Sequence, residues 1–188
     1  PDKVKKNGGA KPGSKLYLTK PIGVGILSTA QKNGVLEPAD SQIGPQNMLK
    51  LNSIGYEISN LSGIEAMTDV TGFGLAGHLI EMCEASDVSA ELYFSQVPVL
   101  PEVDKYLDLK CIPGGTNRNW KSYGEKVAVQ NERNRLLVAD PQTSGGLLIA
   151  VNPEEAANFE AFMDNAQHFY ACIGQLTEKT SAVVAVFD

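Results

Sequence analysis

The chain of 188 residues lacks any apolar run of the roughly 18–20 residues that a membrane-spanning helix requires. Its first residues, PDKVKKNGGAKPGSK, are polar and lack the apolar core of a signal peptide. Lys and Arg number 16 against 22 Asp and Glu, which gives a formal net charge of −6. Proteins that bind nucleic acid phosphates usually carry the opposite balance. We therefore expect neither a membrane nor a nucleic acid as a partner.

Cysteine is scarce: Cys83, Cys111 and Cys172 are widely spaced and form no CxxC pair. This spacing argues against a disulfide framework and a thiolate metal site, and predicts three reduced thiols in a cytoplasmic protein. No Gly-x-Ser-x-Gly motif is present, no Cys has an adjacent His, and no pair of carboxylates stands out as acid and base. The sequence thus offers no recognisable catalytic nucleophile.

The composition, 43% hydrophobic and 20% charged, is that of a globular protein with room for one sizeable domain. Segments that read as strands interleave irregularly with helical patterns. That arrangement favours an α/β (α+β) fold with a mixed sheet over a doubly wound one. Strands are expected within residues 15–20, 64–70, 88–94 and 146–151, and twice within residues 170–188, on either side of a polar turn.

Apolar residues at three- and four-residue steps predict the helices. The longest is expected over residues 41–60, with a buried stripe formed by Met48, Leu51, Ile54, Ile58 and Leu61. Shorter helices are expected over residues 21–34, after residue 70, within residues 98–109, and from Pro153 onward with Phe159, Phe162, Met163 and Ala166 on the core face. Residues 111–135 have weak periodicity and many turn formers, so they are expected to form a long, partly ordered connection.

The segment AMTDVTGFGLAGHLIEM places a lone carboxylate, Asp69, between a predicted strand and a predicted helix. Thr71 can cap that helix, and Gly72 and Gly74 let backbone N–H groups approach a ligand closely. A helix amino terminus attracts phosphate oxygens, whereas a carboxylate there repels them unless a cation lies between. Asp69, Mg²⁺ and phosphate form one consistent combination, and a capped turn without a ligand forms the other. The spacing alone leaves both open.

Further polar turns allow similar alternatives. The turn DPQTSGG, Asp140 to Gly146, can bind an anion or a metal ion, or can simply connect two elements tightly. Lys20 in LTKPIGVG and Arg118 in PGGTNRN can contact phosphate or remain solvated charges on loops. His78 has no His-x-x-His partner, so we expect a capping or packed histidine rather than a metal ligand.

Four segments, LTKPIGVG, AMTDVTGFGLAGHLIEMC, PGGTNRN and DPQTSGGLLIAV, resemble in order and spacing the carboxyl-terminal half of the selenophosphate synthetase (selenide, water dikinase) family. The resemblance extends from Val4 to the chain end and reaches the wider aminoimidazole ribonucleotide synthetase-like superfamily. It implies a three-layer α/β/α domain at residues 16–188, with residues 1–15 as a linker from an absent amino-terminal domain. Since the first residue is Pro1 rather than Met, we expect a fragment of a longer protein.

The resemblance also implies a transferase of the kinase class, which converts ATP, selenide and water into selenophosphate, AMP and orthophosphate with Mg²⁺. Selenophosphate supplies selenoprotein and selenonucleoside synthesis. Asp69 matches a magnesium ligand of the family, and Thr68, Thr71 and Gly72 are expected beside the nucleotide. No catalytic residue is carried over, because the reactive Cys or selenocysteine and its Lys belong to the amino-terminal half. We expect this half to be inactive alone, and the intact enzyme to be a cytoplasmic homodimer with ATP between its domains.

Two alternatives stay open. Hydrogenase-maturation and thiamine-phosphate kinase relatives share DPQTSGG, whereas the pair TDVTGFGLAGHL and PGGT favours the selenium branch. The other alternative is a non-catalytic assembly module whose glycine turns only connect elements.

Overall fold

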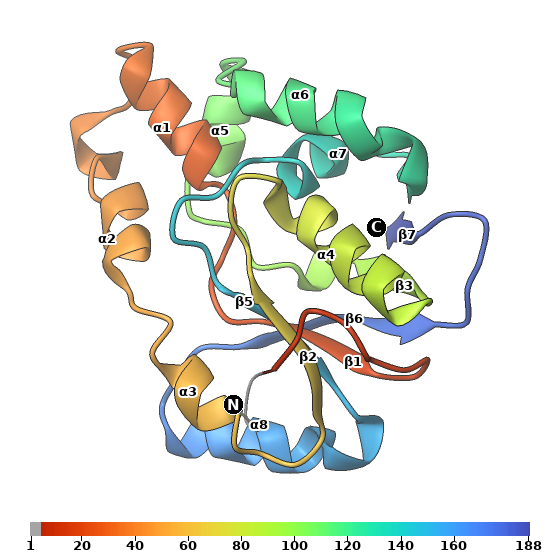
Figure 1. Cartoon of the computed structure of the whole chain (residues 1–188). Helices are drawn as coiled ribbons and strands as arrows, with labels where there is room; N and C mark the ends of the chain where they lie inside the picture. Colours follow the sequence, from red (N-terminus) through yellow and green to blue (C-terminus); the bar gives the residue numbers. More distant parts are fainter. Residues whose placement is uncertain (1–4) are drawn as a thin grey trace.

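The computed structural model describes residues 5–188, which form a seven-stranded mixed sheet with helices on both faces (Figure 1). The strand order is β2-β5-β1-β6-β3-β7-β4. The strands are β1 (Lys15–Leu18), β2 (Ile64–Asp69), β3 (Ser89–Tyr93), β4 (Val127–Ala128), β5 (Leu147–Val151), β6 (Ala171–Thr177) and β7 (Val184–Phe187). The helices are α1 (Val24–Lys32), α2 (Ile43–Leu49), α3 (Ile54–Ile58), α4 (Gly74–Ser86), α5 (Val103–Asp108), α6 (Gly114–Tyr123), α7 (Glu132–Val138) and α8 (Ala156–Asn165).

The strand directions bring three chain segments to one edge of the sheet. β5 is antiparallel to both β1 and β2, with Leu148 opposite Leu18 and Leu147 opposite Asp69. The carboxyl ends of β1 and β2 therefore lie beside the amino end of β5. The loops that continue from these ends carry three of the four segments noted in the sequence.

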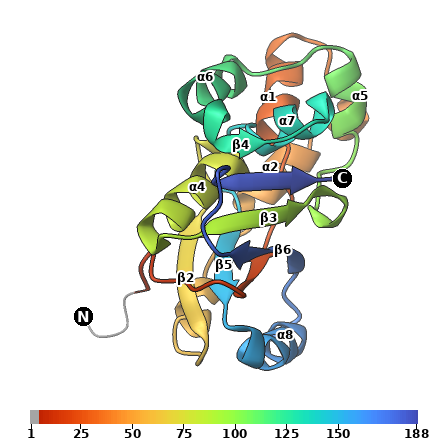
Figure 2. The same cartoon turned by 90° about the vertical axis from the view of Figure 1, so that its right-hand side faces the viewer.

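Successive side chains of β1 point to opposite faces of the sheet, as the pleat of a strand requires, and so belong to two different core clusters. Tyr17 joins Phe159 and Met163 of α8 in the smaller cluster. Leu16 and Leu18 join the larger cluster, which includes apolar residues of α1, α4, α5 and α7. Figures 1 and 2 show α8 on one side of the sheet and α4 on the other. The prediction of a three-layer α/β/α domain with a mixed sheet is confirmed.

Residues 5–14 already lie against the domain. The Met67 amide donates to the Lys6 carbonyl over 3.0 Å, and the Gly9 amide donates to Ser86 Oγ over 3.0 Å. Residues 1–4 of the expected linker lie outside the described residues, and the boundary at residue 15 stays a prediction. No helix within residues 5–188 is both long and apolar enough to cross a membrane.

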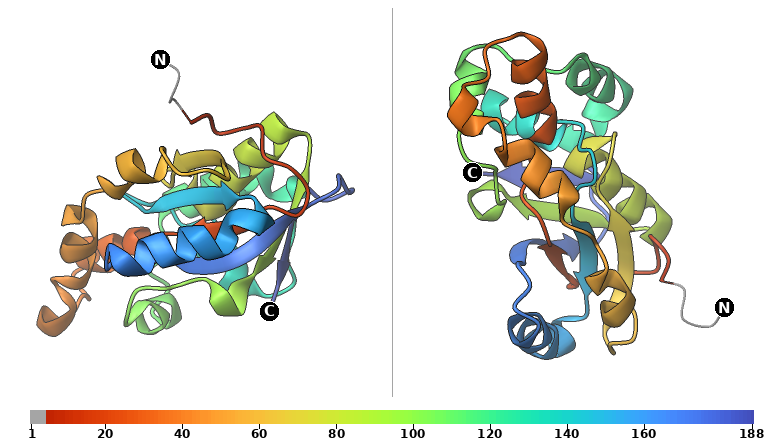
Figure 3. Two further views of the ribbon diagram at one scale, coloured as in Figure 1. Left: turned by 90° about the horizontal axis from the view of Figure 1, so that it is seen from below. Right: turned by 90° about the vertical axis from the view of Figure 1, so that its left-hand side faces the viewer.

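The single helix expected over residues 41–60 is wrong. The chain forms α2 and α3 instead, and Figure 3 shows them in succession between α1 and the end of the molecule where α8 lies. The break follows from a tertiary contact, because the Lys50 carbonyl accepts a hydrogen bond from Lys20 Nζ over 2.5 Å. Lys50 is extended, with φ −67° and ψ 122°. Leu51, predicted to be buried, is therefore exposed.

The partly ordered connection expected over residues 111–135 is also wrong, because it contains all of α6 and the start of α7. The inward face of α6 is largely polar, with Thr116 and Asn119 buried beside Tyr123. A hydrophobic pattern could not reveal such a helix. Asn131 caps α7 by accepting from the Arg133 and Asn134 amides.

The carboxyl-terminal elements agree better with the sequence. Pro153 opens a short 3-10 turn that leads into α8, and Phe159 and Met163 are buried as predicted. Ala166 is exposed, which corrects its expected place on the core face. Two strands follow, as predicted, but β6 and β7 do not form a hairpin: they flank β3, antiparallel and parallel respectively.

Candidate functional site

The polar turn after β2 and the turn before β5 are held together by backbone hydrogen bonds. The Val70 amide donates to the Gly146 carbonyl over 2.9 Å, and the Gln142 amide donates to the Thr71 carbonyl over 3.0 Å. At Gly145, an added Cβ would lie 2.2 Å from the Val70 carbonyl oxygen. The two segments that the sequence suggested as separate candidates are therefore one structural unit.

Helix α6 contributes two side chains that fix the same loop. Asn119 Nδ2 donates to the Gly72 carbonyl over 2.8 Å and to the Ala139 carbonyl over 3.0 Å. Tyr123 donates its hydroxyl proton to the Phe73 carbonyl over 2.6 Å. The sequence analysis did not identify either residue, although Asn119 is the last residue of the segment PGGTNRN and could have been considered. They hold the loop from a third element.

Asp69 ends β2 at this edge, where its side chain is exposed. The carboxylate makes no hydrogen bond or ion pair with any residue of the described part of the chain. Thr68 is half-buried, and among residues 5–188 its hydroxyl makes only a long contact of 3.5 Å, with the Asp69 carbonyl. An exposed carboxylate without a protein partner can bind a cation without breaking an existing interaction.

Gly72 lies in the loop between Asp69 and α4. A Cβ added there would meet no atom within 4 Å, so the space beside this residue is open. Within residues 5–188, the amides of Gly72 and Phe73 donate no hydrogen bond. Free amides before a helix of 13 residues are suited to an anion. The loop thus combines cation and anion ligands within a few residues.

Thr71 does not cap α4, which corrects the sequence prediction: no side chain of the described residues caps this helix. Its hydroxyl lies 3.0 Å from His78 Nε2, and His78 Nδ1 lies 3.1 Å from Glu81 Oε2. A carboxylate only accepts hydrogen bonds, so with a neutral imidazole Nδ1 carries the proton and Nε2 accepts from Thr71. The Thr71 oxygen then offers its lone pairs to the surroundings. His78 is buried, as the expectation of a packed histidine requires.

Asp140 and Gln142 bind the amino terminus of α1. Gln142 Oε1 accepts from the Gly23 and Val24 amides, both over 3.2 Å, and Asp140 Oδ2 accepts from the Gly25 amide over 3.0 Å. Asp140 is fully buried, and this burial raises the pKa of its carboxyl to about 7, against the opposing effect of the hydrogen bonds. The turn DPQTSGG therefore anchors a helix, and this buried carboxyl is not available to an external metal ion.

Lys20 was predicted either to contact phosphate or to remain a solvated charge on a loop, and the structure excludes the solvated charge. The side chain is 2% exposed, and Nζ donates to the Lys50 carbonyl over 2.5 Å and to the Ser144 carbonyl over 2.8 Å. Burial, followed by the nearby charge of Lys50, lowers the pKa of the Lys20 ammonium group. Arg118 is exposed on α6, as the alternative of a solvated charge predicts.

The three cysteines are free thiols in the described structure. Cys83 and Cys111 are buried, and burial raises the pKa of the Cys83 thiol to about 12. Burial also raises the pKa of Cys172. A nucleophilic thiol needs the opposite shift. Among the described residues no group of three or more His, Cys, Asp and Glu side chains could hold a metal ion. Asp69 is thus one metal ligand at most, not a complete site.

The family described as "AIR synthase related protein, C-terminal domain" matches residues 11–187. Among curated proteins, the chain is 54% identical over 179 residues to a selenide, water dikinase of Aeromonas hydrophila, covering 95% of the chain and 52% of that protein. It is 50% identical over 185 residues to a selenide, water dikinase of Shewanella baltica strain OS185, covering 98% and 53%. The chain spans about half the length of the curated relatives it matches.

Solved structures share the fold at lower identity. A thiamine-monophosphate kinase from Stenotrophomonas maltophilia K279a superposes with a TM-score of 0.66 at 13% identity, covering 98% of this chain and 53% of that one. The hydrogenase maturation protein HypE of E. coli gives 0.64 at 19% identity, covering 97% and 48%. HypE in complex with ATP gives 0.62 at 18% identity, covering 99% and 50%.

Proposed function

Because the chain belongs to the family of AIR synthase related C-terminal domains, we propose that it is the carboxyl-terminal domain of a selenide, water dikinase. The intact enzyme would convert selenide, ATP and water into selenophosphate, AMP and orthophosphate. This half contributes Asp69 to binding of the magnesium–nucleotide complex. Its partners are its own amino-terminal domain and, in a cytoplasmic homodimer, a second copy of the intact chain.

The exposed, unpartnered carboxylate of Asp69 carries this proposal. Mg²⁺ typically binds one or two protein carboxylates together with water and substrate phosphates. Asp69, the Thr71 oxygen and the free amides of Gly72 and Phe73 match that set of ligands, since they offer oxygen donors to a cation and N–H donors to phosphate. The metal would neutralise phosphate charge and orient the nucleotide when bound. Asp69 would hold the ion, while Thr68, Thr71 and Gly72 would line the nucleotide.

The groups that perform the reaction are assigned to the other half of the protein. The thiols of Cys83 and Cys172 have pKa values raised by burial, and Cys111 is buried. Lys20 donates to two carbonyls inside the domain. We therefore propose that the 188-residue chain alone does not consume ATP in the presence of selenide. Turnover by the purified chain would contradict this assignment.

Relatives of the same fold, a thiamine-monophosphate kinase and the hydrogenase maturation protein HypE, form the second candidate. The thiamine-monophosphate kinase and HypE structures match at 13–19% identity, whereas the selenide, water dikinases match at 50–54%. This difference favours the dikinase. The product nucleotide separates them, because the proposed reaction releases AMP and the alternatives release ADP. A non-catalytic assembly module would show neither product.

Replacement of Asp69 by Asn in the full-length protein tests the proposal. The substitution keeps the size of the side chain but removes its charge and exchanges one acceptor oxygen for an NH₂ donor, so we expect AMP formation to be abolished and the thermal midpoint to be unchanged. Asp108→Asn is the matched control, because Asp108 is an exposed carboxylate at the end of α5. Near-normal turnover of Asp69→Asn at saturating Mg²⁺ would refute the metal assignment.

A further inference from the structure

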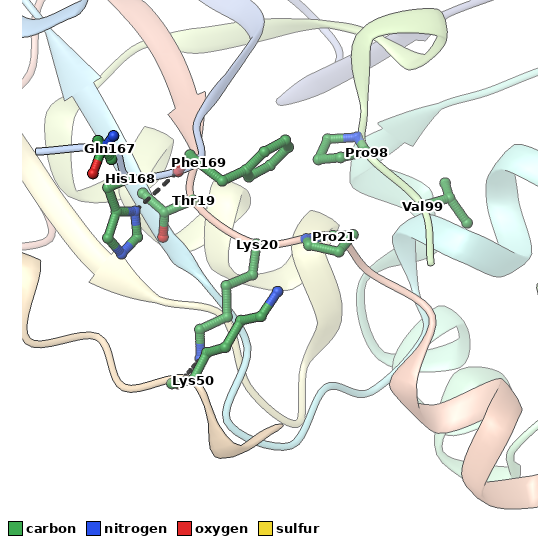
Figure 4. A pocket seen from close by; sticks show the side chains of 9 residues that line it. All are labelled: Thr19, Lys20, Pro21, Lys50, Pro98, Val99, Gln167, His168 and Phe169. Carbon is green, nitrogen blue, oxygen red and sulfur yellow. Dashed lines mark hydrogen bonds between the residues drawn. The ribbon is translucent and has the colours of Figure 1, made fainter. Parts of the chain in front are cut away.

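A cavity of about 490 Å³ opens beside the end of β1. Its walls come from four separate segments: residues 19–21 after β1; Lys50; Pro98 and Val99 before α5; and residues 167–169 between α8 and β6. Lys50, which follows α2, closes the lower side in Figure 4. Asp69 does not line this cavity. Its size lies within the range of small-molecule sites, roughly 300–1,000 Å³.

The charge of this cavity is positive and unbalanced. Lys20 and Lys50 both line it, and no Asp or Glu among residues 5–188 does. Within the described part of the chain, Lys50 Nζ makes no hydrogen bond or ion pair, and Figure 4 shows its side chain extending into the open space toward Pro21. Lys20 is 2% exposed and its Nζ donates to two carbonyls, so it contributes positive charge beneath the cavity wall rather than a free donor. Two neighbouring ammonium groups without a carboxylate repel each other, although the protein as a whole has a net charge of −6. A bound anion would relieve this repulsion.

The remaining walls are apolar and include an aromatic ring. Phe169 is 52% exposed, and in Figure 4 its ring faces Pro98 across the cavity. Pro21 and Val99 extend the apolar surface. His168 Nδ1 lies 3.1 Å from the Phe169 carbonyl, so Nε2 is the ring nitrogen left for a ligand. Such walls suit a flat ring, which stacks on an aromatic side chain or packs against prolines.

We propose that this cavity is a binding site for a small aromatic phosphate monoester, with its ring between Phe169 and Pro98 and its phosphate at Lys50, above the buried charge of Lys20. A phosphate monoester carries a charge of about −1.5 to −2 at neutral pH, which matches two ammonium groups. A nucleoside monophosphate combines both features. The inference goes beyond the proposed function, because it depends on neither Asp69 nor ATP turnover.

Titration of the 188-residue chain with AMP, followed by NMR signals of Lys50, His168 and Phe169, tests the site. We expect saturable shifts at these residues with a Kd at or below about 1 mM. Adenosine lacks the phosphate and ribose 5-phosphate lacks the ring, so each should bind at least about tenfold more weakly. No saturable shift with AMP, or equal binding of adenosine or ribose 5-phosphate, would overturn the proposal.

Two exposed positions allow variants that keep the fold. Lys50→Gln retains the backbone carbonyl that Lys20 needs, and Phe169→Ala removes the ring; each should weaken AMP binding about tenfold or more. Lys32→Gln, at an exposed lysine that ends α1, is the matched control and should bind AMP as the parent does. Unchanged affinity in both Lys50→Gln and Phe169→Ala, with circular dichroism like that of the parent, would place AMP elsewhere and refute the site.

Discussion

The Thr71 hydroxyl lies 3.0 Å from His78 Nε2, one helical turn into α4. This contact determines what the loop after β2 offers to a ligand. With a neutral imidazole protonated at Nδ1, the Thr71 hydroxyl gives its proton to Nε2 and presents oxygen lone pairs, which suit a cation or a bound water. Glu81 fixes the imidazole orientation through Nδ1 over 3.1 Å. The loop is therefore oriented from α4, and not only by the Asn119 and Tyr123 contacts from α6.

A double-mutant cycle should detect this contact. Thr71→Val removes the hydroxyl at nearly constant size, His78→Ala removes the imidazole, and both are expected to destabilise the chain in urea unfolding. A hydrogen bond contributes about 0.5–1.5 kcal/mol, so the coupling free energy should lie in that range. Coupling within about 0.3 kcal/mol of zero would mean that the two side chains act independently. Glu81→Gln, at a half-exposed carboxylate, should cost less than His78→Ala.

Burial of Asp140 predicts a pH dependence of unusual sign for a carboxylate. The folded-state pKa is about 7 against an ordinary value of 3.8, so the folded chain binds this proton more tightly than the unfolded chain. The resulting stabilisation is complete below the ordinary pKa and is lost as pH rises through the folded pKa. Asp140→Asn cannot titrate. As pH rises from about 5 to about 7, the unfolding free energy of the parent should therefore fall by about 2 kcal/mol relative to that of Asp140→Asn.

The difference between parent and variant is the quantity to measure, because other carboxylates titrate in both proteins. Hydrogen bonds from Tyr106 and Arg133 lower the pKa values of Asp40 and Asp104, so protonation of these two carboxylates at low pH destabilises parent and variant alike. Chemical denaturation at several pH values gives the difference directly. A difference that stays constant across this range would show that Asp140 does not titrate there.

The sequence predicted the layers of this fold because most strands and helices show their periodicity. The alternation of apolar residues along residues 15–18 correctly predicted strand β1, and the stripe at Phe159 and Met163 correctly predicted the buried face of α8. Two predictions were wrong for a common reason: the single helix over residues 41–60 and the partly ordered connection over residues 111–135. Lys50 leaves the helix because buried Lys20 takes its carbonyl, and α6 is attached through polar Asn119 and Tyr123. Contacts between distant residues decided both, and no local pattern contains them.

In the candidate site too, the sequence predicts what depends on neighbouring residues and misses what depends on distant contacts. Asp69, Gly72 and the adjoining turn could be identified because a strand end, a carboxylate and glycines are consecutive in sequence. The role of Thr71 could not, since its partner His78 is reached only after α4 has formed. Nor could the sequence distinguish a buried Lys20 from a solvated one. That distinction depends on the carbonyls of Lys50 and Ser144, which are 30 and 124 residues away.

Gly25 should be intolerant of a side chain, although alanine is the better helix former. A Cβ there would lie 2.4 Å from Asp140 Oδ1 and 2.6 Å from the Pro141 carbonyl oxygen. We expect Gly25→Ala to destabilise the chain by about 1–3 kcal/mol in urea unfolding, because α1 must shift away from the loop that binds its amino terminus. Gly44→Ala is the helical control. Its Cβ would meet only Leu27 at 4.0 Å, so it should be neutral or stabilising by up to about 1 kcal/mol. Equal effects of the two substitutions would contradict the close contact.

Gly72 offers the opposite case, a glycine whose replacement should spare the fold and impair the site. A Cβ at this position meets nothing within 4 Å, and its φ is not in the left-handed region. Gly72→Ala should therefore change the unfolding free energy by no more than about 0.5 kcal/mol. The methyl group would occupy the open space in which the proposed nucleotide approaches the free amides of Gly72 and Phe73. In the full-length protein we expect the apparent affinity for Mg–ATP to fall about tenfold or more, measured as the KM for ATP in AMP formation. Normal KM with normal stability would show that no ligand approaches the loop from this side.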